Sequence, residues 1–365
     1  MKHWHCLTAV VVMAIGLLGG CQGGDGNGPR LLVDPLDAQQ LGYTVDWQID
    51  LALPEQSQLM YAELLGDRLV TVEDQNIVSV IDADNGDILW RHQVTRPTDQ
   101  LSRPQRDGDR LVISSQRRAY VLNIDDGEIQ SIIDLLHVSL GTPVVHNGLM
   151  IHASPRGVLF AQELDSGLLA WDFQVDVGFA SAPTLTGGRI FATDLGGNVW
   201  SFDPLEGTLR WTRAVAEPVV AHPEAGERLV YVPSTDYSLY AMRLSNGSVQ
   251  ARHYATGSLD RSPFLVNGLL LQAVSDDAML SLNPEDIREV RWRSEELVDA
   301  RPIQVRGTTL DLYQDGQLIH IDTGDGSEIG ATDLGNVRHV LSTSRTGGTL
   351  YLLQLNGRIL KASPR

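Results

Sequence analysis

One short figure recurs along this chain at an interval of about forty residues. It consists of an acidic residue, a turn that contains Gly and a Trp four residues after that Gly, as in "DADNGDILW" (82–90), "ELDSGLLAW" (163–171) and "FDPLEGTLRW" (202–211). The turn glycines at positions 86, 127, 167, 207 and 247 are separated by 41, 40, 40 and 40 residues; the degenerate "NPEDIRE" lies near 286, and Gly326 follows. A period of this length is typical of β-propellers built from four-stranded blades.

A second marker precedes each of these turns by about twenty residues. It is a Gly-containing hairpin turn that leads into an aliphatic strand, as in "GDRLVTV" (66–72), "GGRIFAT" (187–193) and "NGLLLQA" (267–273). Short alternating stretches such as "GNVWSFD" connect the two markers, and no long amphipathic helical period follows the N-terminal region. The sequence therefore predicts an all-β chain with four strands per repeat.

The Trp residues predict how the ring closes. Trp47, Trp90, Trp171, Trp211 and Trp292 are separated by 43, 81, 40 and 81 residues, which is one or two periods each. Trp47 lies in a last-strand sequence with no blade before it, whereas "GGTLYLLQLNGRILKASPR" at the C-terminus lacks a last strand. The two fragments complete one blade, so we expect eight blades, closed by an N-terminal strand that leaves no free sheet edge.

The repeat resembles that of the quinoprotein-type (PQQ-like) propeller family, whose core reads Ala-x-Asp-x-x-Thr-Gly-x-x-x-Trp. Ala161, Gly167 and Trp171 carry the match, as do Asp82 with Gly86 and Trp90, and Asp203 with Gly207 and Trp211. The resemblance implies that each turn Gly has a positive φ and that each Trp packs between neighbouring blades. We therefore expect a structural, blade-docking role for the following residues: Trp47, Trp90, Trp171, Trp211, Trp292, Gly86, Gly127, Gly167, Gly207, Gly247 and Gly326.

The N-terminus predicts export and lipidation. Lys2 precedes the apolar run "LTAVVVMAIGLL", which is too short to span a bilayer and suits a signal peptide. It ends in "LLGGC", which resembles the lipobox of bacterial lipoproteins and implies that Cys21 is acylated. A plain secretory signal is the alternative, although it would leave Cys21 as a lone thiol. We expect a signal peptide (1–20), a lipidated Cys with a tether (21–42) and one propeller domain (43–365).

Composition and motifs argue against several functions. The formal charge of −18 argues against binding to nucleic acid and against electrostatic attachment to anionic lipid. The alcohol-oxidising quinoproteins use a pair of adjacent cysteines, which this chain lacks, although family branches without that pair leave a quinone-dependent oxidoreductase open. The acidic turns do not match the ligand spacing of an EF-hand loop. We expect no catalytic residues, no cofactor and no metal.

The blade number, signal and tether together resemble the BamB-type family of lipoprotein subunits in the outer-membrane β-barrel assembly machinery. This resemblance implies a monomeric, non-catalytic protein-interaction scaffold on the periplasmic side of the outer membrane, a location that Gln22 after the Cys also favours. The family docks its partner through a Leu-x-Leu-Arg core, but the equivalent "VDVGFASAP" (175–183) has only one large residue, Phe179.

The candidate partner-binding residues are Phe179 and, in the long connection 94–108, Arg96, Arg103 and Arg106. Long loops on a rigid ring are where propellers bind partners, but ordinary surface variation explains them equally well. Three functions stay open: an assembly scaffold, a propeller that binds another envelope protein or a glycan, and the oxidoreductase.

Overall fold

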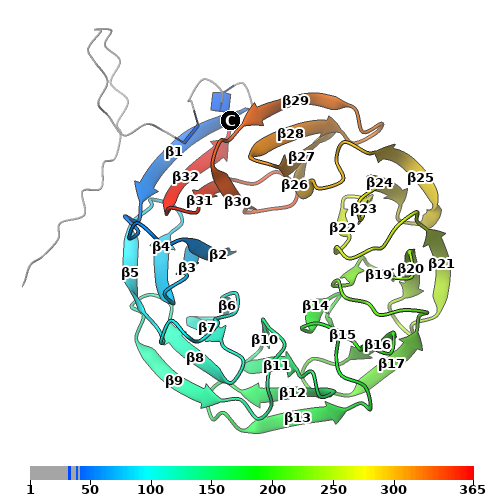
Figure 1. Ribbon diagram of the computed structural model, residues 1–365, viewed down its shortest axis with the longest axis horizontal. Helices are drawn as coiled ribbons and strands as arrows, with labels where there is room; N and C mark the ends of the chain where they lie inside the picture. The colour runs from blue at the N-terminus through cyan, green and yellow to red at the C-terminus, as the bar shows by residue number, and fades with distance from the viewer. Residues whose placement is uncertain (1–31, 34–37, 40–41) are drawn as a thin grey trace, which may run out of the picture.

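The computed structural model describes residues 32–33, 38–39 and 42–365, and these form a ring of eight four-stranded antiparallel sheets (Figure 1). Each sheet is one blade, and its first strand lies toward the centre of the ring. The fold predicted from the forty-residue period is therefore confirmed. Cys21 and the signal sequence lie outside the described residues.

The blades follow one another in chain order. Blades 1 and 2 consist of β2 (Leu59–Leu65), β3 (Arg68–Glu73), β4 (Ile77–Asp82), β5 (Ile88–Gln93), β6 (Gln105–Asp107), β7 (Arg110–Ser114), β8 (Arg118–Asn123) and β9 (Ile129–Asp134). Blades 3 and 4 consist of β10 (Val144–His146), β11 (Leu149–Ala153), β12 (Val158–Glu163), β13 (Leu169–Gln174), β14 (Thr184–Thr186), β15 (Arg189–Thr193), β16 (Asn198–Phe202) and β17 (Leu209–Ala214).

The second half of the ring has the same organisation. Blades 5 and 6 consist of β18 (Glu224–Ala225), β19 (Leu229–Ser234), β20 (Ser238–Arg243), β21 (Val249–Tyr254), β22 (Phe264–Val266), β23 (Leu269–Val274), β24 (Ala278–Asn283) and β25 (Asp286–Ser294). Blades 7 and 8 consist of β26 (Arg301–Arg306), β27 (Thr309–Gln314), β28 (Gln317–Asp322), β29 (Glu328–Asp333), β30 (Val337–Ser342), β31 (Leu350–Gln354), β32 (Arg358–Pro364) and β1 (Tyr43–Asp50).

The ring closes through the two ends of the chain. In blade 8 the strand order is β1-β32-β31-β30, and β1 pairs with β32 from Tyr43↔Pro364 to Asp50↔Arg358. Figure 1 shows β1 (blue) beside β32 (red). Arg365 N donates a hydrogen bond to Gly42 O at 2.9 Å, so the two ends meet where another blade has a turn. The closure predicted from Trp47 is confirmed.

The Trp residues lie between blades and fix each one against the next. Trp90 in blade 1 packs over the turn of blade 2, where a Cβ added to Gly127 would lie 2.6 Å from its ring. The indole Nε1 of Trp90 donates to Ile124 O at 2.8 Å in the same turn. Corresponding bonds run from Trp47 to Asp84 O, from Trp211 to Leu244 O and from Trp292 to Thr323 O. An indole away from solvent needs such a partner, so each of these four Trp residues contributes both packing and a hydrogen bond.

The turn glycines are required by the same contact. All six expected turn glycines have a positive φ, between 63° and 82°. Five of them face a Trp of the preceding blade closely enough that any side chain would collide with it. Gly167 instead faces Ile133, because Ser131 occupies the Trp position of blade 2.

The folded body extends upstream of the boundary expected at residue 43. Val33 and Ala38 are each 4% exposed and belong to the apolar cluster shared by blades 7 and 8. Leu32 N also donates to the side-chain oxygen of Gln48 on β1, at 2.8 Å. Part of the segment expected to be a tether therefore packs against the propeller. Within the described ranges, no helix has the length and apolar character needed to cross a membrane.

Candidate functional site

The connections of the propeller emerge on two opposite sides of the ring. Because neighbouring strands are antiparallel, the connections between blades and the turns between second and third strands lie on one side, called here the interblade side. The remaining turns, which include the acidic-Gly figure, lie on the opposite side. The interblade side carries the longer connections, and loops on a rigid scaffold are where proteins most often bind partners.

Five large apolar or aromatic side chains are exposed on the interblade side of blades 3 to 5, which we call the docking face. Their exposed fractions are 40% for Val177, 57% for Leu195, 42% for Val220, 53% for Tyr237 and 70% for Tyr254. They come from successive connections and turns, so they follow the ring from one blade to the next. Apolar side chains that gather in one region of a surface mark an interaction site more often than single ones do.

Backbone hydrogen bonds hold the segments of the docking face together. Leu195 N donates to Gly178 O at 2.9 Å, which joins the turn of blade 4 to the connection before it. Thr193 Oγ1 donates to Val219 O at 2.7 Å, and Thr235 N donates to Pro218 O at 3.2 Å. The connections and turns therefore form a continuous, fixed surface, which lowers the entropy that binding would cost.

At the blade 5 end of the docking face, an Arg is stacked between two Tyr rings. The guanidinium carbon of Arg252 lies 4.8 Å from the ring centre of Tyr240 and 4.4 Å from that of Tyr254. Arg252 Nη2 also pairs with Asp236 Oδ2 at 2.9 Å. Burial, together with the neighbouring Asp236, raises the pKa of Tyr240 to about 12, so its hydroxyl stays protonated and donates to that carboxylate.

Tyr237 is held in a conformation that non-glycine residues rarely adopt. Its φ is +67°, in the left-handed region, and its aromatic ring projects into solvent. Strained backbone of this kind is found preferentially at functional sites, where the surrounding structure maintains it. Tyr and Arg are also the residue types enriched at the energetic centres of protein interfaces. The end of the docking face at blade 5 therefore has the chemistry of an interface anchor.

Phe179, the expected partner-binding residue of the 175–183 connection, is not on the surface. Its side chain is 1% exposed and packs in the apolar cluster shared by blades 3 and 4, while its backbone bridges to Asp194. The exposed apolar side chain of this connection is Val177, next to the exposed Asp176. Side-chain size suggested Phe179 from the sequence, but the loop turns the largest ring inward.

The three expected Arg residues lie near blades 1 and 2, away from the docking face. Arg106 donates to Leu65 O and to Asp67 Oδ1, both at 2.6 Å, and so links blade 2 to blade 1. Arg103 is exposed and pairs with Glu63 at 2.5 Å. Arg96 is exposed in the connection itself. The structure therefore does not bring these arginines together with the 175–183 connection.

Sequence reasoning did not single out Leu195, Val220, Tyr237 or Tyr254. For Leu195 and Tyr237 the available signal was an apolar or aromatic residue in a turn, directly after Asp, where a polar residue is expected; Val220 and Tyr254 carry no such signal. That signal is weak because a loop has no periodicity that tells which side chains point outward.

The polar groups of the interior include one fully buried histidine, His152. His152 is fully buried, which lowers its pKa to about 3, and its Nδ1 lies 2.8 Å from Ser139 Oγ. Its Nε2 has no partner in the part of the chain that the structure describes, so no carboxylate orients the ring as in a catalytic triad. Across the described ranges, no group of three or more His, Cys, Asp or Glu side chains is placed to hold a metal ion.

Comparison with known proteins finds relatives described as outer membrane protein assembly factors. The family model described as "Outer membrane protein assembly factor BamB" matches residues 44–132 and 131–332. The Yersinia pestis protein of that name is 21% identical over 290 residues, which cover 72% of this chain and 73% of that protein. The Escherichia coli protein of that name is 25% identical over 179 residues, which cover 42% of this chain and 45% of that protein.

A solved structure supports the fold. The crystal structure of BamB from Moraxella catarrhalis superimposes with a TM-score of 0.70 and 17% sequence identity. The superposition covers 88% of this chain and 97% of that one. At this identity the likeness concerns the architecture, which is the same closed ring of blades.

Proposed function

Because the chain belongs to the family of the outer membrane protein assembly factor BamB, we propose that it acts as a non-catalytic scaffold in the assembly of outer-membrane β-barrel proteins. The observation that carries this proposal is the family match across residues 44–332, which spans seven of the eight blades. A propeller fold by itself supports many functions, so the family match rather than the fold supports this one.

We place the binding of an envelope-protein partner on the docking face. Its five side chains combine exposed aliphatic groups with Tyr rings, Arg252 stacks against one of those rings, and the hydrogen-bonded loops present them rigidly. Such a surface suits a partner that offers a complementary apolar patch bordered by polar groups. The protein itself is proposed to be a monomer that contacts the membrane only through its lipid anchor.

Crosslinking in native membranes tests the docking face. Leu195→Glu, alone or with Val177→Glu, places a charge in the middle of the proposed interface, and we expect recovery of a large barrel insertase to fall at least tenfold. Leu169→Glu is the matched control, because Leu169 is 48% exposed but lies on the outer strand of blade 3. Equal recovery with Leu195→Glu and Leu169→Glu would place the interface elsewhere. Failure of the unaltered protein to recover any insertase would contradict the scaffold function.

We propose that the protein is anchored on the periplasmic side of the outer membrane by acyl chains on Cys21. The support is the lipobox-like "LLGGC" and the family's place in outer-membrane assembly. Two acyl chains give persistent attachment, so Cys21→Ala is expected to release the protein into the soluble periplasmic fraction. A Cys21→Ala protein that still sediments with membranes shows that another element anchors it.

A further inference from the structure

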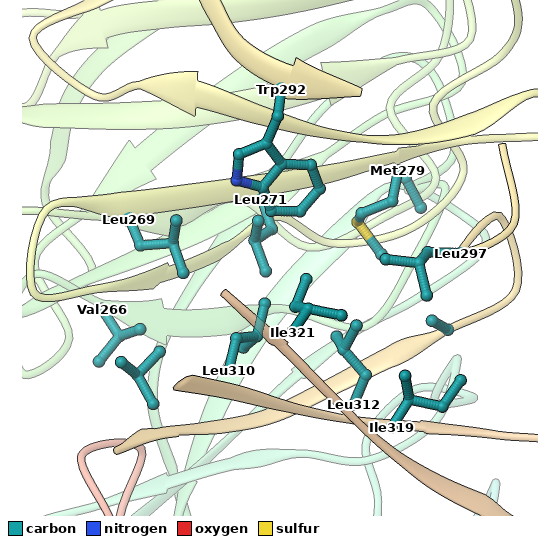
Figure 2. Packing of buried hydrophobic residues seen from close by; sticks show 13 residues of the cluster. Val266, Leu269, Leu271, Met279, Trp292, Leu297, Leu310, Leu312, Ile319 and Ile321 are labelled. Atoms are coloured by element: carbon teal, nitrogen blue, oxygen red, sulfur yellow. The ribbon is translucent and has the colours of Figure 1, made fainter. Parts of the chain in front are cut away.

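A concave region between blades 6 and 7 lies on the interblade side, outside the docking face. It encloses about 520 Å³, a volume typical of sites that hold a few side chains or a small ligand. Its apolar wall includes Phe264, Leu271 and Met279 from blade 6 and Pro302 from blade 7. Figure 2 shows Leu271 and Met279 within the buried cluster that joins the two blades, so the wall rests on a rigid core.

Some charged side chains around this groove have an ion-pair partner, and others do not. Arg261 Nη2 pairs with Asp299 Oδ1 at 2.7 Å, and Asp315 lies on the exposed turn after β27. Arg301, at the start of β26, forms no ion pair with any carboxylate of the described residues. Its guanidinium carbon instead lies 5.3 Å from the ring centre of Tyr313. The groove therefore contains one cation whose charge the described protein does not neutralise.

The surroundings of Arg301 make this charge unfavourable in the free protein. Its side chain is reached by solvent but is surrounded by protein in the concave wall, and this burial lowers its pKa. The positive charge of Arg103 lowers it further. Burial lowers the pKa of His339, and the charges of Arg301 and Arg103 lower that pKa further. An anion bound beside Arg301 would relieve the repulsion, so the groove favours a negatively charged ligand.

The groove continues along the inner strands of the ring. A second cavity of about 540 Å³ shares Ser262, Phe264, Arg301 and Pro302 with the first. Its far end carries Arg345 of blade 8, which reaches Glu224 of blade 5 at 2.7 Å. The two cavities are therefore continuous past Arg301 and Phe264, which gives an extended chain room on both sides of the Arg301 guanidinium.

We propose that this groove binds an extended peptide segment in which an acidic residue precedes an apolar one. The planar guanidinium of Arg301 pairs with the carboxylate through charge-assisted hydrogen bonds, and the wall at Phe264 and Pro302 receives the apolar side chain. Gln314 Oε1 is buried in the groove without a partner among the described residues, and it accepts a peptide N–H. The site is separate from the docking face and does not depend on the proposed assembly role.

Fluorescence polarisation with labelled peptides tests the proposal on the purified full chain. The probe is an extended hexapeptide with Asp-Leu at its centre and Ser and Gly elsewhere. Arg301→Gln is expected to weaken its binding about tenfold, the usual effect of losing one charge-assisted pair. Arg156→Gln is the matched control, since Arg156 is exposed on the interblade side and has no ion pair within the described residues. The control is expected to bind as the unaltered protein does.

Changes in the peptide separate the two parts of the site without altering the protein. Replacing Asp by Asn, or Leu by Ser, is expected to weaken binding to the unaltered protein about tenfold or more. With Arg301→Gln the Asp and Asn peptides are expected to bind equally. Binding that is insensitive to Arg301→Gln, equal binding of the Asp and Asn peptides to the unaltered protein, or no binding at millimolar peptide overturns the proposal. Leu195→Glu should leave peptide affinity unchanged, which distinguishes this site from the docking face.

Discussion

Blade 7 meets its two neighbours through two different kinds of interface. Toward blade 6 the contact is apolar: Leu310, Leu312, Ile319 and Ile321 pack against the blade that carries Trp292 (Figure 2). Toward blade 8 the intervening positions of the same strands carry Asp311 and His320. Because side chains alternate along a strand, a single blade can present an apolar face to one neighbour and, to the other, a face on which polar groups lie beside the apolar cluster shared with blade 8.

The polar contact is centred on Asp311, which has no exposed surface. Its carboxylate accepts hydrogen bonds from Arg306 and Gln304, both at 2.9 Å, and lies 2.7 Å from His320 Nδ1. Tyr43, the first residue of β1, reaches the same carboxylate with its hydroxyl at 3.4 Å and lies under the Arg306 guanidinium. Burial alone would raise the pKa of Asp311, but the hydrogen bonds from His320, Arg306 and Gln304 outweigh burial and lower it.

The difference follows from how the ring closes. At five other junctions a Trp packs on the turn between the third and fourth strands of the next blade, but in blade 8 this turn is replaced by the two chain ends. Blade 7 correspondingly has Gly330 at its Trp position, opposite His320. The closing interface thus adds hydrogen bonds from a residue distant in sequence to its apolar contacts, whereas the interface with blade 6 relies on apolar packing and on the repeated Trp and Gly.

Deletion of residues 43–50 should lower the stability of the protein more than any other change, and it acts on the closing interface. It removes β1, so blade 8 loses its outer strand, β32 becomes an unpaired sheet edge and Asp311 loses Tyr43. We expect loss of the cooperative thermal transition, or a melting temperature lower by more than about 10 °C, measured by circular dichroism. Deletion of residues 22–30 is the control and should leave the transition in place. Similar melting curves for the two deletions contradict the composite-blade closure.

Asp311→Asn should cost about 3 kcal/mol of unfolding free energy at pH 7, because it leaves Arg306 facing an uncharged partner in a buried site. The folded-state pKa of Asp311 is lowered, so its stabilisation is present above the unfolded-state pKa of about 3.9 and is lost as the pH falls through the lower folded-state value. Urea unfolding at pH 7 and below pH 4 measures this. If the difference in unfolding free energy between the unaltered protein and Asp311→Asn is as large below pH 4 as at pH 7, Asp311 is not the titrating group.

Trp292→Phe tests how much the Trp stabilises the apolar interface between blades 6 and 7. Trp171→Phe is the matched variant. Trp292 is 6% exposed and its Nε1 donates to Thr323 O at 3.0 Å. Trp171 is half-buried, and its Nε1 has no partner among the described residues. We expect Trp292→Phe to cost about 2 kcal/mol and Trp171→Phe less than about 1, because only the first leaves a carbonyl without its donor. Equal losses of unfolding free energy in the two variants, measured by urea unfolding, would mean that the indole contributes through its volume and not through its hydrogen bond.

The contrast between the two interfaces also shows what the sequence could predict. The blade count, the closure through Trp47 and the Gly–Trp contacts could be predicted because each recurs with the period. The Asp311 network could not, since Tyr43 and Asp311 are 268 residues apart and neither belongs to the repeated figure. The docking face could not be predicted for a related reason. In the 175–183 connection, only the conformation of the folded loop exposes the side chain of Val177 and buries that of Phe179.

Gly330→Ala should have the smallest effect, and it should be stabilising. No atom lies within 4 Å of a Cβ added at Gly330, and the residue does not have a positive φ, so Ala fits the strand without strain. Replacing a strand Gly by Ala reduces the freedom of the unfolded chain, which should raise the unfolding free energy by about 0.5 kcal/mol. The matched control is Gly307→Ala in the same blade, where the space is equally open but φ is +60°. That substitution should cost about 1 kcal/mol because Ala is strained in the left-handed region. If Gly330→Ala instead destabilises the protein in urea unfolding, the absence of a side chain at the Trp position of blade 7 is itself needed for closure.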